Sequence, residues 1–277
     1  MYGVVTRNAP ELEWEGFDRA VYEVKAPTGR TAEPEAAGAS AVSCFGDTAT
    51  VEVRPELAQR DAAGRPATRE RADFGWSSVC PTEPDYRAGV LETVADAAAA
   101  SGDVRLDDVG FAGPAYCRCD RCDRLAAESD HDDRTAWRAA TVSAFVADAA
   151  ERVPGRLSLS VHPDPYPGHL RRHGGVDLAA VADDVDEVVV PLYDAHYDTT
   201  YWLDTLAAGF ADRTDDLGLE LGVELYAADV DLDRLEAAAA TVEPHADVTY
   251  FGYGADAGRA VLRRRAAAAG EGVEHGP

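Results

Sequence analysis

The chain has 277 residues, 46% of them hydrophobic, a length and composition typical of one large globular domain. Its 51 acidic residues outnumber 26 basic ones and give a formal net charge of −25, which argues against nucleic acid or an anionic membrane as a partner. Only one basic residue is a lysine, Lys25, and this balance is typical of a halophilic protein, whose dense carboxylates keep the surface hydrated in a salt-saturated cytoplasm.

Two further features bear on where the protein works. No run of 18 apolar residues is present, so the sequence predicts no transmembrane helix. The first residues, MYGVVTRNAPELEWEG, lack the charged-then-apolar pattern of a secretory signal. We therefore expect a cytoplasmic protein, in which thiols stay reduced and free to hold a metal.

Short apolar segments alternate with amphipathic ones along the chain. Counted generously, the strands are expected at residues 2–7, 19–24, 41–47, 104–109, 156–161, 187–192, 219–225 and 247–252. Helices are expected at residues 82–101, 135–152, 176–182, 200–211, 232–242 and 256–269. Residues 26–39 and 48–79 are predicted to be loops, and residues 270–277 a disordered tail.

This alternation of strand and helix predicts an α/β fold with a parallel sheet and right-handed crossovers. Eight strand–helix units predict a TIM (β/α)8-type barrel in one domain over residues 1–269. The first three units are poorly formed in the sequence. A barrel with a degenerate N-terminal part, or another parallel sheet, therefore stays open.

Three thiols lie within six residues at Cys117, Cys119 and Cys122, among charged neighbours that argue against a plain buried role. Three close thiolates with a fourth from elsewhere match tetrahedral zinc, and the best fourth ligand is Cys80. Cys44 lies in an apolar run and is predicted to be core. We expect a structural zinc that holds a loop at about residues 110–130.

Two alternatives concern these thiols. A thioredoxin-like redox pair of Cys119 and Cys122 needs a preceding strand and leaves Cys117 unexplained. A zinc enzyme is disfavoured because four thiolates close the metal shell and leave no position for substrate.

Alternation within the predicted strands indicates which polar side chains point into the barrel. Apolar neighbours face outward, so Asp107, His162 and Glu224 point inward near the carboxyl ends of their strands, where TIM-barrel active sites lie. A carboxylate such as Glu224 at the end of a buried strand is costly unless it is paired or used. Glu220, deeper in the same strand, is predicted to pair with Arg105.

Two carboxylates across a barrel mouth, with aromatic rings around them, are what glycoside hydrolysis requires. We therefore assign Asp107 and Glu224 as the candidate catalytic pair. The residues expected to bind substrate are Asp108, His162, Asp164, Tyr193, Asp194, His196 and Tyr253.

Each of these residues also has a simpler interpretation. Asp107-Asp108 can end a strand as a turn, and Asp164 lies between two prolines where turns form. His162 can be a satisfied core histidine, and His196 can be an exposed loop residue.

Several segments resemble a known family. Cys80 followed at a distance by Cys117, Cys119 and Cys122 resembles the zinc cluster of family 42 glycoside hydrolases, the beta-galactosidase type. Residues 106–111 (LDDVGF) resemble the LDYIRF strand of related uncharacterised glycosidase-like barrels, and residues 55–66 and 80–87 are similar to two further segments of that group. The resemblance is clearest over residues 41–125.

This resemblance implies a glycosidase-like barrel with an acid/base after strand four and a nucleophile after strand seven, the places of Asp107 and Glu224. Where family 42 carries Asn-Glu at the end of the fourth strand, this sequence has Asp107-Asp108. Two hypotheses follow: a carbohydrate-active hydrolase with a saccharide substrate, or a non-catalytic barrel that binds a saccharide or a protein partner. They differ in whether Asp107 and Glu224 face one open pocket or are engaged by an arginine.

Overall fold

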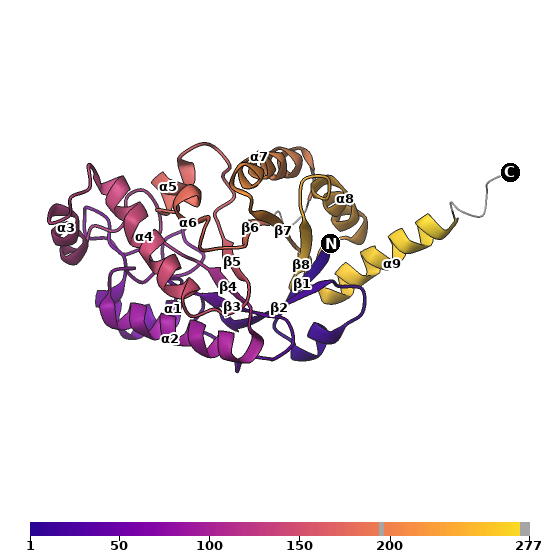
Figure 1. The fold of residues 1–277 in the computed structure, drawn as a ribbon, viewed down its shortest axis with the longest axis horizontal. Coiled ribbons are helices and arrows are strands. Elements are labelled where there is room, and N and C mark those ends of the chain that lie inside the picture. Colours follow the sequence, from indigo (N-terminus) through magenta and orange to yellow (C-terminus); the bar gives the residue numbers. More distant parts are fainter. Residues whose placement is uncertain (194–196, 272–277) are drawn as a thin grey trace.

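The computed structural model describes residues 1–193 and 197–271 of the chain. Eight strands form a closed barrel in sequence order, and each strand is parallel to both neighbours (Figure 1). The strands are β1 (Tyr2–Thr6), β2 (Arg19–Lys25), β3 (Ala39–Ser43), β4 (Val104–Asp107), β5 (Leu157–Ser160), β6 (Glu187–Leu192), β7 (Glu220–Tyr226) and β8 (Val248–Gly252). The predicted TIM barrel is confirmed.

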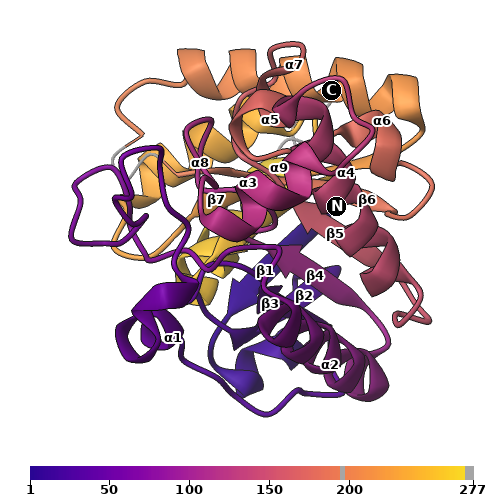
Figure 2. The same cartoon turned by 90° about the vertical axis from the view of Figure 1, so that its left-hand side faces the viewer.

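Helices surround most of the barrel. They are α1 (Thr48–Val53), α2 (Pro84–Ser101), α3 (Asp120–Ala127), α4 (Arg134–Ala150), α5 (His169–His173), α6 (Leu178–Val181), α7 (Tyr201–Leu217), α8 (Leu232–Val242) and α9 (Ala255–Glu271). Two 3₁₀ helices, η1 (Ala9–Glu13) and η2 (Pro55–Leu57), lie in the N-terminal half. Figure 2 shows α7 across one side of the barrel and α2 on the opposite side.

The N-terminal units are the degenerate part of the barrel. Only η1 connects β1 to β2, and no helix connects β2 to β3 in the described chain. After β3 the expected strand ends early, at Ser43, because the Asp47 side chain accepts the Thr50 N–H at 2.9 Å and begins α1. The β-branched sequence of α1 hid this short helix from a periodicity argument.

Two apolar layers hold the fold together. The larger lies between the barrel and its helices, and a small one inside the barrel contains Val5, Val21, Ala41, Val189 and Tyr250. The interior above and below this small layer is polar and charged, which leaves room for chemistry at both ends. No helix in the described residues is long and apolar enough to cross a bilayer.

The last helix differs from the prediction. α9 continues to Glu271 and extends away from the barrel (Figure 1). The predicted tail of residues 270–277 is therefore described only in its first two residues, which are helical, and residues 272–277 lie outside the described chain.

Candidate active site and metal centre

Backbone strain concentrates at the carboxyl ends of the barrel strands, the end we call the mouth. Within residues 1–193 and 197–271, four non-glycine residues have a positive φ: Asp108 at 53°, Tyr197 at 46°, Asp229 at 57° and Tyr253 at 62°. They follow β4, β6, β7 and β8 respectively. Left-handed backbone at such residues costs about 1–3 kcal/mol each and is typical of functional sites.

The inward residues of β4 and β7 meet through one buried arginine. Arg105 Nε lies 2.7 Å from Asp107 Oδ1, and its Nη1 is in ion contact with Glu224 Oε2. Burial alone would lower the pKa of Arg105, but the two carboxylates raise it well above its usual value. Arg105 therefore stays charged and joins the two residues predicted as the catalytic pair.

The two carboxylates differ in their access to solvent. Glu224 is fully buried, and the Tyr193 hydroxyl donates a hydrogen bond to its other oxygen. The Asp107 side chain is 20% exposed. Burial, and then the nearby Glu224 charge, raise the pKa of Asp107 against the opposing effect of Arg105. Asp107 is thus reachable from the mouth, whereas Tyr193 and Arg105 enclose Glu224.

Asp108 faces a cavity of about 410 Å³ beside this cluster. Its Oδ2 accepts a hydrogen bond from Ser43 Oγ at 2.5 Å, and burial, then the charge of Asp107, raise its pKa to about 7. The cavity wall includes the rings of Phe74, Trp76 and Phe111. A carboxyl that is half protonated near neutral pH, next to aromatic rings, can donate a proton to a bound molecule.

Two imidazoles complete the cavity wall. The rings of His162 and His173 stack with centroids 4.3 Å apart and planes 7° from parallel. Burial lowers the pKa of both, and the second ring lowers that of His173 further. Both imidazoles are therefore uncharged at neutral pH, and His162 lines the cavity as a neutral ring.

Among the described residues, the other predicted binding residues, Asp164, Tyr193 and Tyr253, do not line this cavity. Asp164 accepts from the Tyr166 N–H and pairs with His169 Nδ1 at 2.7 Å. The Tyr253 hydroxyl donates to Glu23 Oε2 at 2.9 Å on the far side of the mouth. Asp194 and His196 lie outside the described residues.

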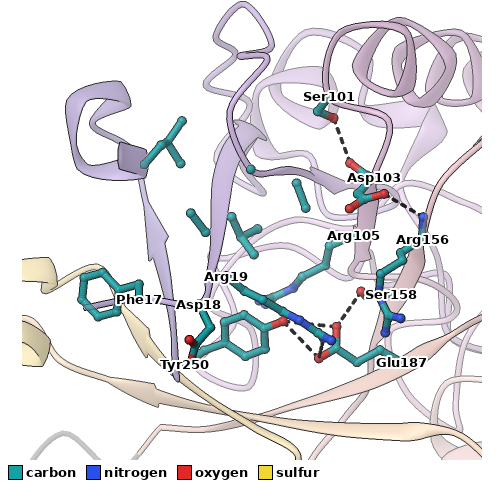
Figure 3. A pocket seen from close by; sticks show the side chains of 15 residues that line it. Phe17, Asp18, Arg19, Ser101, Asp103, Arg105, Arg156, Ser158, Glu187 and Tyr250 are labelled. Carbon is teal, nitrogen blue, oxygen red and sulfur yellow. Dashed lines mark hydrogen bonds and ion pairs between the residues drawn. The ribbon is translucent and has the colours of Figure 1, made fainter. Parts of the chain in front are cut away.

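The predicted pairing of Glu220 with Arg105 is wrong. Glu220 Oε2 contacts Arg19 Nη2 at 2.8 Å and Arg156 Nη2 at 2.7 Å, near the amino ends of the strands. Arg19 also reaches the buried Glu187, which accepts from Ser158 and Tyr250 in a second cavity of about 340 Å³ (Figure 3). The charges at this end are mutually paired, a pattern typical of stability rather than catalysis.

Three parts of the mouth were not predicted from the sequence. Glu23 on β2 binds Arg7 and Arg30, Lys25 pairs with Asp47 at 3.1 Å, and Trp76 enters from the long loop. The alternation rule that was used for β4 and β7 also applies to β2. It places Glu23 and Lys25 on the inward face, so both could have been predicted. No local pattern marks Trp76, because its loop has no regular structure.

The four cysteines predicted as metal ligands lie together. Their Sγ atoms are all within 4.8 Å of one another, with Cys80 at 3.4 Å from Cys122 and 3.8 Å from Cys119. A tetrahedral site with metal–sulfur bonds of about 2.3 Å has sulfur–sulfur edges of about 3.8 Å, so one metal ion fits. Cys44 is buried elsewhere, as predicted, and donates to the Val42 carbonyl.

Neighbouring groups support thiolates at this centre. The Arg60 amide donates to Cys117 Sγ at 3.4 Å, and Thr82 Oγ1 lies 3.3 Å from Cys122 Sγ. α3 carries Cys122 and was not predicted, because its sequence DRCDRLAA is short and half of it is charged. The centre joins two segments that are distant in the sequence: the end of the long loop at Cys80, and the Cys117 turn with the start of α3.

The metal centre is connected to the mouth cavity by two contacts. Fully buried Gln59 donates to the carbonyls of Val79 and Gly110 and accepts from the Ala112 N–H, so it joins the Cys80 segment to the cavity wall. Phe74, on the other wall, packs edge-on against Tyr116 with ring centroids 5.6 Å apart. Tyr116 immediately precedes Cys117, so the cysteine cluster anchors both walls.

Comparisons with known proteins show limited similarity. No family model and no curated protein matches the chain. An alpha-amylase from Lactobacillus plantarum aligns over 92% of this chain and 70% of its own, with 12% identity and a TM-score of 0.46. An endo-1,4-beta-xylanase from Caldicellulosiruptor owensensis aligns over 70% of this chain and 60% of its own, with 13% identity and a TM-score of 0.38. The barrel assignment therefore rests on the strand pairing of the chain itself, and the likeness to family 42 remains one of sequence motifs.

Proposed function

We propose that the barrel mouth binds a saccharide and hydrolyses a glycosidic bond. The observation that carries this proposal is the contrast between two adjacent carboxyls. Asp107 is held by the permanently charged Arg105, whereas Asp108 has a pKa of about 7 and faces a cavity with aromatic walls. Neighbouring carboxyls with different environments are the usual arrangement of a base or nucleophile with its acid partner.

In this proposal each residue has a distinct role. Asp108 donates the proton to the leaving glycosidic oxygen, and Asp107 acts as nucleophile or activates water. Glu224, which the sequence placed in the catalytic pair, acts as a positioning residue because it is enclosed by Arg105 and Tyr193. It fixes the guanidinium that orients Asp107.

Trp76 supplies a stacking surface for a sugar ring. Its indole Nε1 and Asp108 Oδ2 lie 2.8 and 2.9 Å from the position that a Cβ of Gly46 would occupy. Only glycine leaves both groups in place there. A saccharide packed on Trp76 is thereby next to the proposed proton donor.

A zinc ion suits the cysteine cluster, and its role here is structural. Four thiolates fill a tetrahedral shell, so zinc supplies a cross-link between loops and leaves catalysis to the carboxyls. Thiols grouped for a metal fit a reducing compartment such as the cytoplasm. The charge of −25 with one lysine fits a halophilic protein that works in concentrated salt.

A second function is favoured by one observation. Arg105 engages both residues of the predicted pair, which is the arrangement expected of a non-catalytic barrel that binds a saccharide. A screen of aryl-glycosides and oligosaccharides in molar KCl separates the two functions. Turnover that is lost in Asp108→Asn and Asp107→Asn supports hydrolysis. Binding without turnover supports the second function, and the absence of both rejects a saccharide site.

A further inference from the structure

The mouth contains a second charged cluster, opposite the cavity. Glu23 on β2 is 3% exposed and accepts from Arg7 through Nε at 2.7 Å and Nη2 at 3.1 Å. Arg30 Nη2 donates to the same carboxylate at 3.0 Å, and the Tyr253 hydroxyl donates at 2.9 Å. The carboxylate is thus saturated by four hydrogen bonds, which fix both arginines at the rim.

This cluster carries an unbalanced positive charge. Two guanidinium groups share one carboxylate, whereas a single arginine suffices to neutralise it. Arg7 and Arg30 are 53% and 39% exposed at their side chains. In the described part of the chain, the Arg7 guanidinium bonds only Glu23 and Tyr253, and Arg30 Nε and Nη1 make no hydrogen bond or ion pair. These donors are available to a bound anion.

The cluster borders the proposed reaction centre. Arg7 follows β1, Arg30 lies in the turn after β2, and Tyr253 follows β8, so all three stand at the mouth. Arg7 lies over the Tyr253 ring at 4.4 Å from its centroid. The charge of Glu23 is close enough to Asp107 to raise the pKa of that carboxyl. Asp107 and the two arginines therefore stand at the same end of the barrel, with Glu23 between their charges.

We propose that Arg7 and Arg30 recognise an acidic substituent on the saccharide, a carboxylate, sulfate or phosphate group. This inference rests on the proposed function and narrows its substrate class to anionic glycans. Guanidinium groups suit such oxyanions because they form paired, directional hydrogen bonds. In molar salt the Debye length is about 3 Å, so the net negative charge of the protein repels an anion little at long range and direct contacts decide binding.

The test uses ligand pairs that differ only in the acidic group. Calorimetric titration in 1 M KCl compares a uronic acid oligosaccharide with its methyl ester, a sulfated oligosaccharide with its desulfated form, and a phosphorylated sugar with the free sugar. We expect one acidic member to bind at least tenfold more tightly than its neutral partner. The pair that shows this preference identifies the acidic group.

Variants locate the preference on the two arginines. Arg7→Gln and Arg30→Gln should each lower affinity for the acidic member about tenfold and leave the neutral member unchanged. Arg7→Lys keeps a positive charge beside Glu23. It should therefore retain part of the preference, and it controls for loss of folding. Arg69→Gln is the matched control, because Arg69 is 59% exposed and pairs with Glu52 at 2.9 Å rather than with Glu23.

The possible failures are distinguishable. Equal binding of acidic and neutral members, or a preference that survives both glutamine variants, overturns this inference while saccharide binding itself stands. Binding of inorganic sulfate or phosphate that Arg7→Gln abolishes, with no saccharide bound, keeps the anion site but rejects the proposed function. No binding of any of these ligands rejects both.

Discussion

Arg105 and Glu224 form an ion contact inside the barrel, with 5% and 0% of their side chains exposed. Both charges are removed from water, so Glu224 depends on Arg105 for compensation, and Arg105 depends on Glu224 and Asp107. The Arg105 guanidinium that pairs with buried Glu224 also orients Asp107, so one side chain serves both the stability of the barrel and the proposed chemistry.

Replacing Glu224 by Gln should destabilise the protein by about 3 kcal/mol, because Arg105 loses one of its two buried counter-charges. Turnover should fall as well, since the guanidinium that orients Asp107 is no longer fixed by Glu224. Glu220→Gln is the control, because that side chain is 36% exposed and should cost under about 1 kcal/mol. Thermal unfolding in molar KCl measures both. Equal stability of Glu224→Gln and wild type would show that the ion contact is dispensable.

Asp108 should make stability and activity depend on pH. Its folded pKa of about 7 lies above the unfolded value of about 3.9, so the neutral carboxyl stabilises the fold fully below about pH 4 and this contribution is lost as pH rises through 7. The stability of wild type relative to Asp108→Asn should therefore fall between pH 4 and pH 8. Melting curves across this range check the sign.

If Asp108 is the proton donor, kcat/KM should fall as pH rises through about 7, because the acid is then lost. Asp108→Asn should abolish most turnover on substrates with poor leaving groups. A rate that rises through pH 7 would instead assign Asp108 as a base.

Metal removal should loosen the mouth as well as the cysteine loop. Cys119→Ser should lose the predicted one zinc per chain and melt at lower temperature, because structural zinc contributes directly to folding. It should also weaken saccharide binding, since Tyr116 and Gln59 connect the cluster to the cavity walls. Cys44→Ser should keep its zinc. Metal analysis that finds equal zinc in both variants would contradict the assignment.

Trp76→Ala should lower saccharide affinity about tenfold with little change in stability, because the side chain is 40% exposed and offers its face to the cavity. Trp202→Ala is a matched control, since Trp202 is 60% exposed and does not line that cavity. Titration with the best ligand of the screen measures both. A similar loss of affinity in the two variants would show that Trp76 is not part of the saccharide site.

The melting temperature should rise between low and molar KCl. With a net charge of −25, carboxylates at low ionic strength repel one another over about 10 Å, and at 1 M salt over about 3 Å. Scans in KCl, with an uncharged osmolyte as control, test this. A melting temperature that is independent of KCl would remove the case for a halophilic protein.

Strand alternation was sufficient to predict the barrel and to place Asp107 and Glu224 inside it. It could not predict their partners, because alternation gives the face of a side chain but not its height in the barrel. Height depends on the tilt of the strands. Arg105, Ser158, Glu187 and Glu220 are successive register partners on β4 to β7, but in a tilted barrel such a row does not stay at one height along the axis. Glu224, four residues further along β7, is the one that reaches Arg105.

The cysteine spacing predicted its cluster well, because close thiols among charged residues have few stable alternatives to a metal. The cavity wall was not predictable in the same way. Trp76 lines the cavity because the long loop lies over the mouth, where Gln59 donates to the Val79 carbonyl beside Cys80. Such placement depends on contacts between distant segments, which a local pattern does not record.

The four left-handed residues in the described chain all lie at the mouth, so substitutions at this end have different consequences from substitutions at the other end of the barrel. At Asp229, an exposed turn, glycine would relieve backbone strain at little chemical cost, whereas at Asp108 and Tyr253 it would delete a side chain of the site. The paired charges of Arg19, Glu187 and Glu220 at the other end bear no proposed chemistry. Substitutions at that end can therefore change the stability of the protein, whereas substitutions in the mouth loops change its substrate specificity.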